Sequence, residues 1–272
     1  MPIKFRGPVP ESVLAFFRGK GLRPGFDYRD VWRAEHASAF TVAKAMQADV
    51  LTSIREAIDA AIAEGKTLRA FQAELTPTLQ RLGWWGRKKM TDPETGEKVL
   101  AQLGSPRRLR TIYTANLRTA RAAGQWERAQ RTKAALPYLR YSLGPSEVHR
   151  PEHVAWDGTV LPVDHEFWTT HMPPNGWGCK CRVRQVSKVE MDRRDWQVSP
   201  DPQVTHVDWY NKRTGKTERV PAGIDPGWDT NPGRVRQQNL DLHLAGALDK
   251  APEQVAEALR ADLARYRERN AQ

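Results

Sequence analysis

The sequence has only two cysteines in 272 residues, Cys179 and Cys181. So few thiols exclude the disulfide-rich frameworks of small secreted proteins. A bond between the two is also unfavourable, because a single intervening residue would strain the disulfide. The spacing therefore indicates a metal-binding pair, a pair of reduced thiols or a coincidence.

Long apolar stretches are also missing from the sequence. No run of about 18 apolar residues is present to span a bilayer, and the first residues lack the apolar region of a signal peptide. We therefore expect synthesis in the cytosol and no membrane partner.

Catalytic motifs are equally scarce. The sequence contains no Gly-x-Ser-x-Gly turn, no phosphate-binding loop and no His-Glu-x-x-His motif. It also offers no pair of carboxylates in a distinctive context for acid–base chemistry. We therefore predict no catalytic residues and a protein that is not an enzyme.

Positive charge is what the sequence has in excess, with a formal net charge of +11. Residues 81–150 contain 15 Lys or Arg and 5 Asp or Glu, so this quarter of the chain carries nearly all of the excess. A concentrated positive field attracts polyanions such as DNA through counterion release. The same field also suits solubility or docking on an acidic protein surface.

The first half of the chain has helical periodicity. Apolar residues recur four apart from about residue 30 to residue 64, which predicts one long amphipathic helix ended by Gly65. Thr67 should cap a second helix. Pro77 should kink or split that helix, because proline removes a backbone donor.

Residues 90–104 are rich in turn-forming types and predict a connection. Ser105 as cap and Pro106 at the first helical position then predict a new helix. At about 100° per residue, this helix gathers five arginines within an arc of roughly 80°. They are Arg107, Arg110, Arg118, Arg121 and Arg128. This arginine ridge is either a nucleic-acid-binding surface that contacts phosphates without sequence specificity or an ordinary solvated face.

Farther along, the pattern changes to short aromatic pieces separated by turns. Residues 138–141, 156–161 and 181–186 suit short strands. Residues 191–248 are rich in Pro, Gly and Asp and predict an extended segment anchored by tryptophans, and residues 252–269 predict a final helix.

Together these patterns predict an α+β fold with a mainly helical N-terminal half. We place a helical domain at 1–89, a linker at 90–104, a small loop-rich, short-stranded unit at 105–190, and an extended C-terminal arm with a terminal helix at 191–272. The apolar content of 39% and the charged content of 28% are typical of a folded chain with a wet surface.

The densest cluster of chemically active side chains lies between residues 149 and 181. Two imidazoles and two thiolates would complete the tetrahedral ligand set of a structural zinc site. Our candidate metal ligands are His153, His165, Cys179 and Cys181, with His149, His171, Asp157 and Asp164 as substitutes. The alternative is that the histidines cap loops and the cysteines pack as small apolar groups.

An ordered string of residues in this region resembles the signature of the phage Mu F-like minor head proteins. The string consists of residues 150–153, 157–158, 164–168, 173–177 and 179–182. The upstream helical residues 112–121 are similar to the helix that precedes this signature, and residues 16–18, 32–44 and 83–86 resemble the N-terminal half of such proteins.

The resemblance identifies residues 105–190 as a Mu F-like head-morphogenesis domain. It implies a minor capsid protein of the virion, made in the host cytoplasm and placed in the head interior. It also implies a role in head assembly, DNA packaging or delivery, with the portal and the major capsid or scaffold proteins as partners and packaged double-stranded DNA as a non-specific one. Two alternatives remain: a zinc-dependent nuclease or hydrolase built on the His/Cys set, and a DNA-binding accessory protein.

Overall fold

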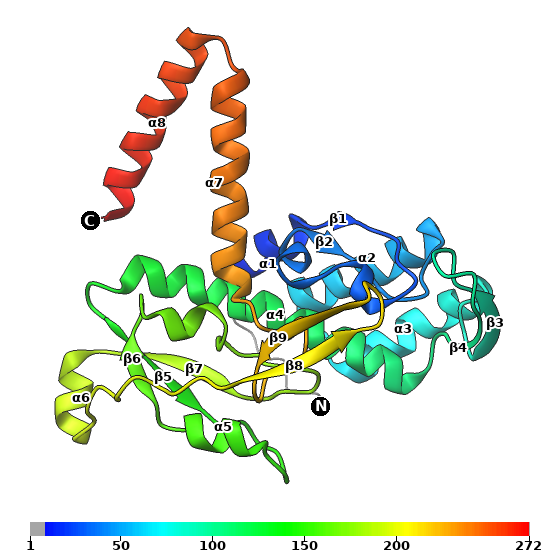
Figure 1. The fold of residues 1–272 in the computed structure, drawn as a ribbon. Coiled ribbons are helices and arrows are strands. Elements are labelled where there is room, and N and C mark those ends of the chain that lie inside the picture. The colour runs from blue at the N-terminus through cyan, green and yellow to red at the C-terminus, as the bar shows by residue number, and fades with distance from the viewer. Residues whose placement is uncertain (1–8, 272) are drawn as a thin grey trace.

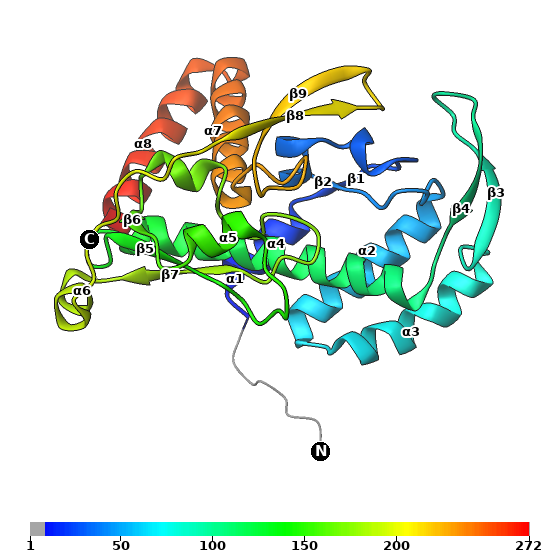
Figure 2. The ribbon, with the colours of Figure 1, turned by 60° about the horizontal axis from the view of Figure 1, so that its bottom comes forward.

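Helix α4 (Pro106–Thr132) runs through the middle of the computed structural model, which describes residues 9–271 (Figure 1; Figure 2). It begins as predicted, with Pro106 in its first turn and the Ser105 hydroxyl accepting a hydrogen bond from the Arg108 amide. Its first two thirds pack on the N-terminal helices, and its last turns pack on a small sheet.

The N-terminal core consists of α1 (Glu11–Arg18), α2 (Ala48–Glu64) and α3 (Leu68–Arg81), packed against α4. The predicted ends at Gly65 and Thr67 are confirmed, since Gly65 adopts the left-handed conformation and the Thr67 hydroxyl accepts from the Ala70 amide. Helix α3 continues through Pro77, so the proline does not split the helix, one of the two outcomes predicted for it. Burial of Leu75 and Leu79 on both sides of the proline holds the two turns together.

The prediction of one helix from residue 30 to residue 64 was wrong in its first half. The chain there forms two short 3₁₀ turns, Tyr28–Asp30 and Arg33–Ala37, and a parallel pair of β1 (Gly21–Leu22) with β2 (Ala39–Phe40). The Asp30 carboxylate accepts hydrogen bonds from the amides of Phe26 and Asp27, which holds the backbone in a turn.

Residues 90–104, expected to be an irregular connection, belong mostly to an antiparallel hairpin of β3 (Arg87–Thr91) and β4 (Lys98–Gln102). Arg213 binds its tip through Asp92 at 2.5 Å and also binds Asp30 at 2.6 Å. A guanidinium far along the chain therefore ties the hairpin to the N-terminal turns.

The C-terminal half contains a three-stranded antiparallel sheet in the order β6-β5-β7. Strands β5 (Tyr138–Ser142) and β7 (Arg182–Val186) confirm two of the predictions. The third strand, β6, covers only Val160–Pro162, because α5 (Pro151–Trp156) occupies the start of the predicted segment. The short turn of Glu166–Thr169 and helix α6 (Lys188–Arg194) complete this unit.

The segment predicted as extended contains two regular elements. One is the antiparallel hairpin of β8 (His206–Asn211) with β9 (Lys216–Pro221), and the other is helix α7 (Pro232–Lys250). Tryptophans do anchor this region, since Trp209 stacks on Trp32 with ring centroids 5.4 Å apart.

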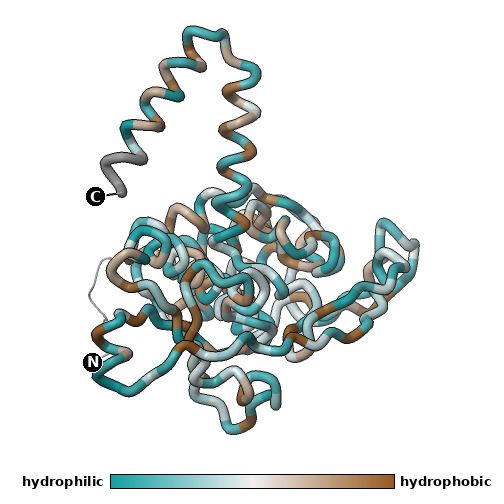
Figure 3. The backbone as a smooth tube through the Cα atoms, turned by 60° about the vertical axis from the view of Figure 1, so that its left-hand side comes forward, coloured by the Kyte–Doolittle hydropathy of each residue, from teal (hydrophilic) through white to brown (hydrophobic). Residues whose placement is uncertain are grey.

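Helix α8 (Glu253–Ala271) follows α7 and diverges from it beyond their connection, in agreement with the predicted final helix (Figure 1). The two helices form an arm that stands away from the rest of the molecule, with apolar and polar residues alternating along it (Figure 1; Figure 3). None of the described helices has the length and apolarity needed to cross a membrane. The predicted α+β class is confirmed.

Candidate metal centre and basic helix

Three of the four predicted metal ligands lie together. His153 comes from α5, and Cys179 and Cys181 come from the loop that leads into β7. One potential ligand atom from each residue lies within 4.8 Å of the other two. The geometry therefore brings one imidazole and two thiols to one point, which we call the His/Cys cluster.

The orientation of the His153 ring is fixed by its surroundings. Its Nε2 lies 2.8 Å from the carbonyl oxygen of Gly223, which can only accept a hydrogen bond. Nε2 therefore carries the proton, and the unprotonated Nδ1 faces the Cys181 sulfur at 3.5 Å. The side chain is only 4% exposed and stacks on Trp156.

The two thiols influence each other directly. Hydrogen bonding from Cys179 lowers the pKa of Cys181, while burial of the Cys181 thiol acts in the opposite direction. The same contact with Cys181, together with burial, raises the pKa of Cys179. The pair is thus arranged as one thiolate beside one thiol.

The cluster fits a zinc ion by donor type and by spacing. Zinc–sulfur and zinc–nitrogen bonds of about 2.3 and 2.1 Å at a tetrahedral angle place the two ligand atoms about 3.6 Å apart. The observed separation of 3.5 Å between Cys181 Sγ and His153 Nδ1 agrees with this value. In metal-ligating histidines, the ring nitrogen that does not bind the metal usually donates a hydrogen bond. Here Nε2 of His153 donates to the carbonyl of Gly223.

His165, the fourth predicted ligand, is not part of this group. Its Nε2 lies 2.8 Å from an Asp201 carboxylate oxygen, and its Nδ1 accepts a hydrogen bond from the Phe167 amide. The ring therefore caps a 3₁₀ turn, as the alternative interpretation of the histidines expects.

The four substitute ligands also have other partners. His149 bonds the Gly144 carbonyl and Asp164 pairs with Lys133, while Asp157 accepts from the Leu143 amide. His171 contacts Thr170 and stacks on Phe167. Among the described residues, the grouping is therefore limited to three ligands.

Two charged residues hold the loop that carries the cysteines. Asp225 accepts a hydrogen bond from the Trp177 amide at 2.7 Å and pairs with Arg150 at 2.7 Å. From the other side, Arg118 of α4 donates to the carbonyl oxygens of Gly178 and Cys179. The loop is thus fixed between α4 and the chain around residue 225.

The arginine ridge lies along α4, as predicted, but its members differ in their surroundings. The guanidinium of Arg118 is occupied by the cysteine loop. The remaining four arginines are exposed to solvent: Arg107, Arg110, Arg121 and Arg128. Within the arginine ridge, only these four guanidinium groups are exposed enough to contact a polyanion.

Sequence reasoning missed several residues around the cluster. Tyr141 and Asn175 are fully buried, and the Tyr141 hydroxyl donates to the Asn175 side-chain oxygen at 3.2 Å. Asn175 stands in the Pro-Pro-Asn-Gly string of the sequence, so its polar type at a buried turn was the available signal. Nothing local marks Asp225, because its partners lie more than 45 residues away.

Comparison with known proteins gives a consistent family. Residues 52–184 match the family model described as phage Mu protein F like protein. The chain is similar to the putative capsid assembly protein F of Escherichia phage Mu, with 40% identity over 238 residues, covering 82% of this chain and 54% of that protein. It is also similar to the Mu-like prophage FluMu F protein of Haemophilus influenzae, with 38% identity over 212 residues, covering 73% of this chain and 50% of that protein. The chain spans about half the length of these curated relatives. No solved structure matches it.

Proposed function

The chain belongs to the phage Mu protein F like family, and from this premise we propose that it is a minor head protein acting in the assembly of a Mu-like phage head. The observation that carries the proposal is the 40% identity, over 82% of the chain, to a protein named for capsid assembly. Its partners would be the portal and the major capsid or scaffold proteins, met in the host cytoplasm and retained in the head interior.

The test is genetic complementation in a phage whose genome encodes this chain. Deleting the gene should reduce the yield of filled heads by several orders of magnitude, measured by electron microscopy and plaque counts. Supplying the wild-type chain from a plasmid should restore both readouts. Normal numbers of filled, infectious particles without the chain would contradict the proposal.

We also propose that the His/Cys cluster holds a structural zinc ion. The ion would connect α5 to the loop before β7 and so stabilise a unit that has only a short sheet. His153, Cys179 and Cys181 supply three ligands, and the fourth position is left to a water molecule or a partner group. The relatives' names favour this structural role over the nuclease or hydrolase that the same residues suggested.

Elemental analysis of purified protein tests the zinc site. We expect about one zinc per chain in the wild type and less than a tenth of that in Cys179→Ser or Cys181→Ser. His165→Asn is the matched control and should keep its zinc, because His165 bonds Asp201 instead. Zinc-free wild-type protein with an unchanged circular dichroism spectrum would remove the idea.

For the nucleic-acid contact, we propose that the four exposed arginines of α4 bind double-stranded DNA through its phosphates. The logarithm of the binding constant falls linearly with the logarithm of the salt concentration, and each arginine lost from such a contact should make this negative slope shallower by about 0.9. Alanine at Arg107, Arg110, Arg121 and Arg128 should therefore flatten the slope by roughly 3 to 4.

The control replaces Arg260 and Arg265, which are also exposed but lie on α8 and pair with Glu253 and Asp262. These changes should leave the slope as it is. Equal slopes for the α4 variant and the wild type would show that the ridge is a solvated face.

A further inference from the structure

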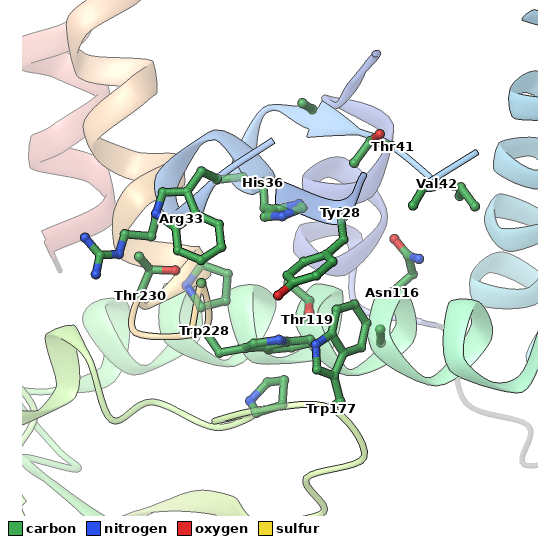
Figure 4. Close-up of a pocket in the computed structure, with 18 of the residues that line it drawn as sticks. Tyr28, Arg33, His36, Thr41, Val42, Asn116, Thr119, Trp177, Trp228 and Thr230 are labelled. Atoms are coloured by element: carbon green, nitrogen blue, oxygen red, sulfur yellow. The ribbon is translucent and has the colours of Figure 1, made fainter. Parts of the chain in front are cut away.

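A cavity of about 220 Å³ lies away from the His/Cys cluster, where four parts of the chain meet. Its walls come from the N-terminal segment with Lys20 and the turns of residues 28–43, from α4, from the loop around Trp177, and from residues 226–235 (Figure 4). By the same measure a single water needs roughly 10–15 Å³, so the space suits a small organic molecule better than a few waters.

Aromatic rings form one side of this cavity. Tyr28 meets the edge of Trp177 with centroids 6.1 Å apart, and Trp177 meets Trp228 at 5.0 Å. Figure 4 shows Tyr28 in the middle of the group, with His36 above it and the two tryptophans below. Such an arrangement offers ring faces and edges to a planar group.

The polar side chains of the lining are all neutral or basic. Lys20, Arg33, His36 and Arg108 line the cavity, and no Asp or Glu is among its lining residues. Arg33 is compensated, because it pairs with Glu218 and Asp229. The guanidinium of Arg108 donates to the carbonyl oxygens of Gln102 and Ala43 and lies over the ring of Trp84.

Lys20 is the most unusual of these residues. It is only 6% exposed, and its ammonium contacts the ring of Phe16 at 4.7 Å. Within the part of the chain that the structure describes, Nζ has no hydrogen bond and no ion pair. Buried charges in proteins are normally paired, so an ammonium in this position is suited to an anion from outside.

The pKa shifts of Lys20 and His36 agree with this geometry. Burial without a counter-charge lowers the pKa of Lys20 to about 8. Burial and the charge of Lys20 lower the pKa of His36 to about 4, so the imidazole is neutral near pH 7. An incoming anion would meet one ammonium and one neutral ring.

We propose that this cavity binds a small organic anion with a planar aromatic body, its charged group at Lys20 and its ring against Tyr28 and the tryptophans. A nucleoside monophosphate and an aromatic carboxylate share this chemistry. The proposal does not depend on the role in head assembly.

Binding is measured by tryptophan fluorescence and by the melting temperature of the full chain. The probes are deoxyadenosine monophosphate and benzoate, with neutral deoxyadenosine and inorganic phosphate as the two half-ligands. We expect at least one of the two anionic aromatic probes to bind at least tenfold more tightly than either half-ligand, and the better one identifies the source of the anion. Failure of both probes at millimolar concentration, or equal binding of neutral deoxyadenosine, would overturn the proposal.

Lys20→Met should weaken binding of the better probe at least tenfold. Lys44→Met is the matched control, because Lys44 also lies over a phenylalanine ring, at 3.8 Å from Phe26, but does not line the cavity. If Lys20→Met does not fold, Thr119→Leu fills the cavity from α4 and should block the probe instead. Wild-type affinity in either cavity variant contradicts the proposed site.

Discussion

Asp225 shows how much a single side chain does in this structure. Its carboxylate holds the Trp177 amide and the Arg150 guanidinium, both at 2.7 Å, and its own amide bonds the Asn175 carbonyl. The loop between these contacts carries an aromatic wall of the cavity at one end and a thiol of the His/Cys cluster at the other. One carboxylate therefore positions parts of two candidate sites.

Replacing Asp225 with asparagine should lower the free energy of unfolding by about 1–3 kcal/mol, because the substitution removes the charge of a partly buried acceptor. Urea denaturation followed by tryptophan fluorescence measures the change. Asp201→Asn is the control, since that carboxylate is 81% exposed and should cost less than about 0.5 kcal/mol. Similar losses in both variants would show that Asp225 does not clamp the loop.

The stability effect of Lys20 should depend on pH. Its pKa is about 8 in the folded chain against 10.5 for the free group, so folding is penalised fully below pH 8. The penalty disappears as pH rises from 8 to 10.5. Lys20→Met should therefore stabilise the ligand-free protein by roughly 3 kcal/mol at pH 7, and by much less at pH 10.

Urea unfolding at several pH values checks this prediction. The neighbouring His36 keeps its state over this range, because its pKa of about 4 leaves the imidazole neutral throughout. A difference between wild type and variant that does not shrink from pH 8 to pH 10 would show that Lys20 is not an uncompensated charge.

For the His/Cys cluster, the sequence could identify candidate ligands by side-chain type but not by their position in the fold. Soft donors are few, so His153, Cys179 and Cys181 could be selected as ligands by their chemistry alone. His165 has the same chemistry and could not be told apart from them. Its position depends on a contact with Asp201, and Lys20 likewise acquires its character from a cavity made by four distant segments.

Among the elements, helices α1, α4 and α7 approach one another closely at glycines. A β-carbon added at Gly124 of α4 would lie 2.6 Å from a methyl group of Val13 and 3.2 Å from its backbone nitrogen. One at Gly233 of α7 would lie 2.6 Å from Trp126. Gly246, also in α7, has open space around it.

These positions predict opposite effects of the same substitution. Gly246→Ala should raise the free energy of unfolding by up to about 1 kcal/mol, because alanine is the better helix former. Gly124→Ala should lower it by about 1–3 kcal/mol, because the added methyl separates α1 from α4. Chemical denaturation of the two variants measures both, and a gain at Gly124 would show that the helices do not pack so closely.

Helix ends were predictable because their signals are local. Ser105, Thr67 and Gly65 act within four residues of themselves, and all three were assigned correctly. The turns of residues 28–37 carry a local signal in Asp30, whose carboxylate binds the Phe26 and Asp27 amides, and this signal was overlooked. They also have a distant partner that the sequence does not mark, since the Trp32 indole donates to Glu218, 186 residues away. The β3–β4 hairpin was missed because its strands are mostly exposed and lack a clear apolar alternation, although they pair residues close in sequence.

At the scale of the whole molecule, the arm of α7 and α8 is the most separate part. Its exposed apolar residues include Leu240, Leu242 and Val255, which are 50%, 70% and 49% exposed. Exposed apolar side chains on a projecting element are accessible to a partner. This agrees with the proposed place among other head proteins.

Removing residues 251–272 should leave the melting temperature of the remaining chain within about 2 °C, because α8 diverges from α7 and buries little. The same truncation should lower the yield of filled heads in the complementation assay. Calorimetry and particle counts give the two readouts. Full complementation by the truncated chain would exclude α8 from the assembly contact.

Helix α4 contributes to the two largest hydrophobic clusters among the described residues. Leu109 and Leu117 belong to the N-terminal one, while Trp126 and Ala129 belong to the one around the sheet. Its 27 residues form a continuous helix about 40 Å long that packs against both halves of the protein. Because one continuous helix packs in both halves, we expect the two halves to unfold in a single cooperative transition rather than one after the other.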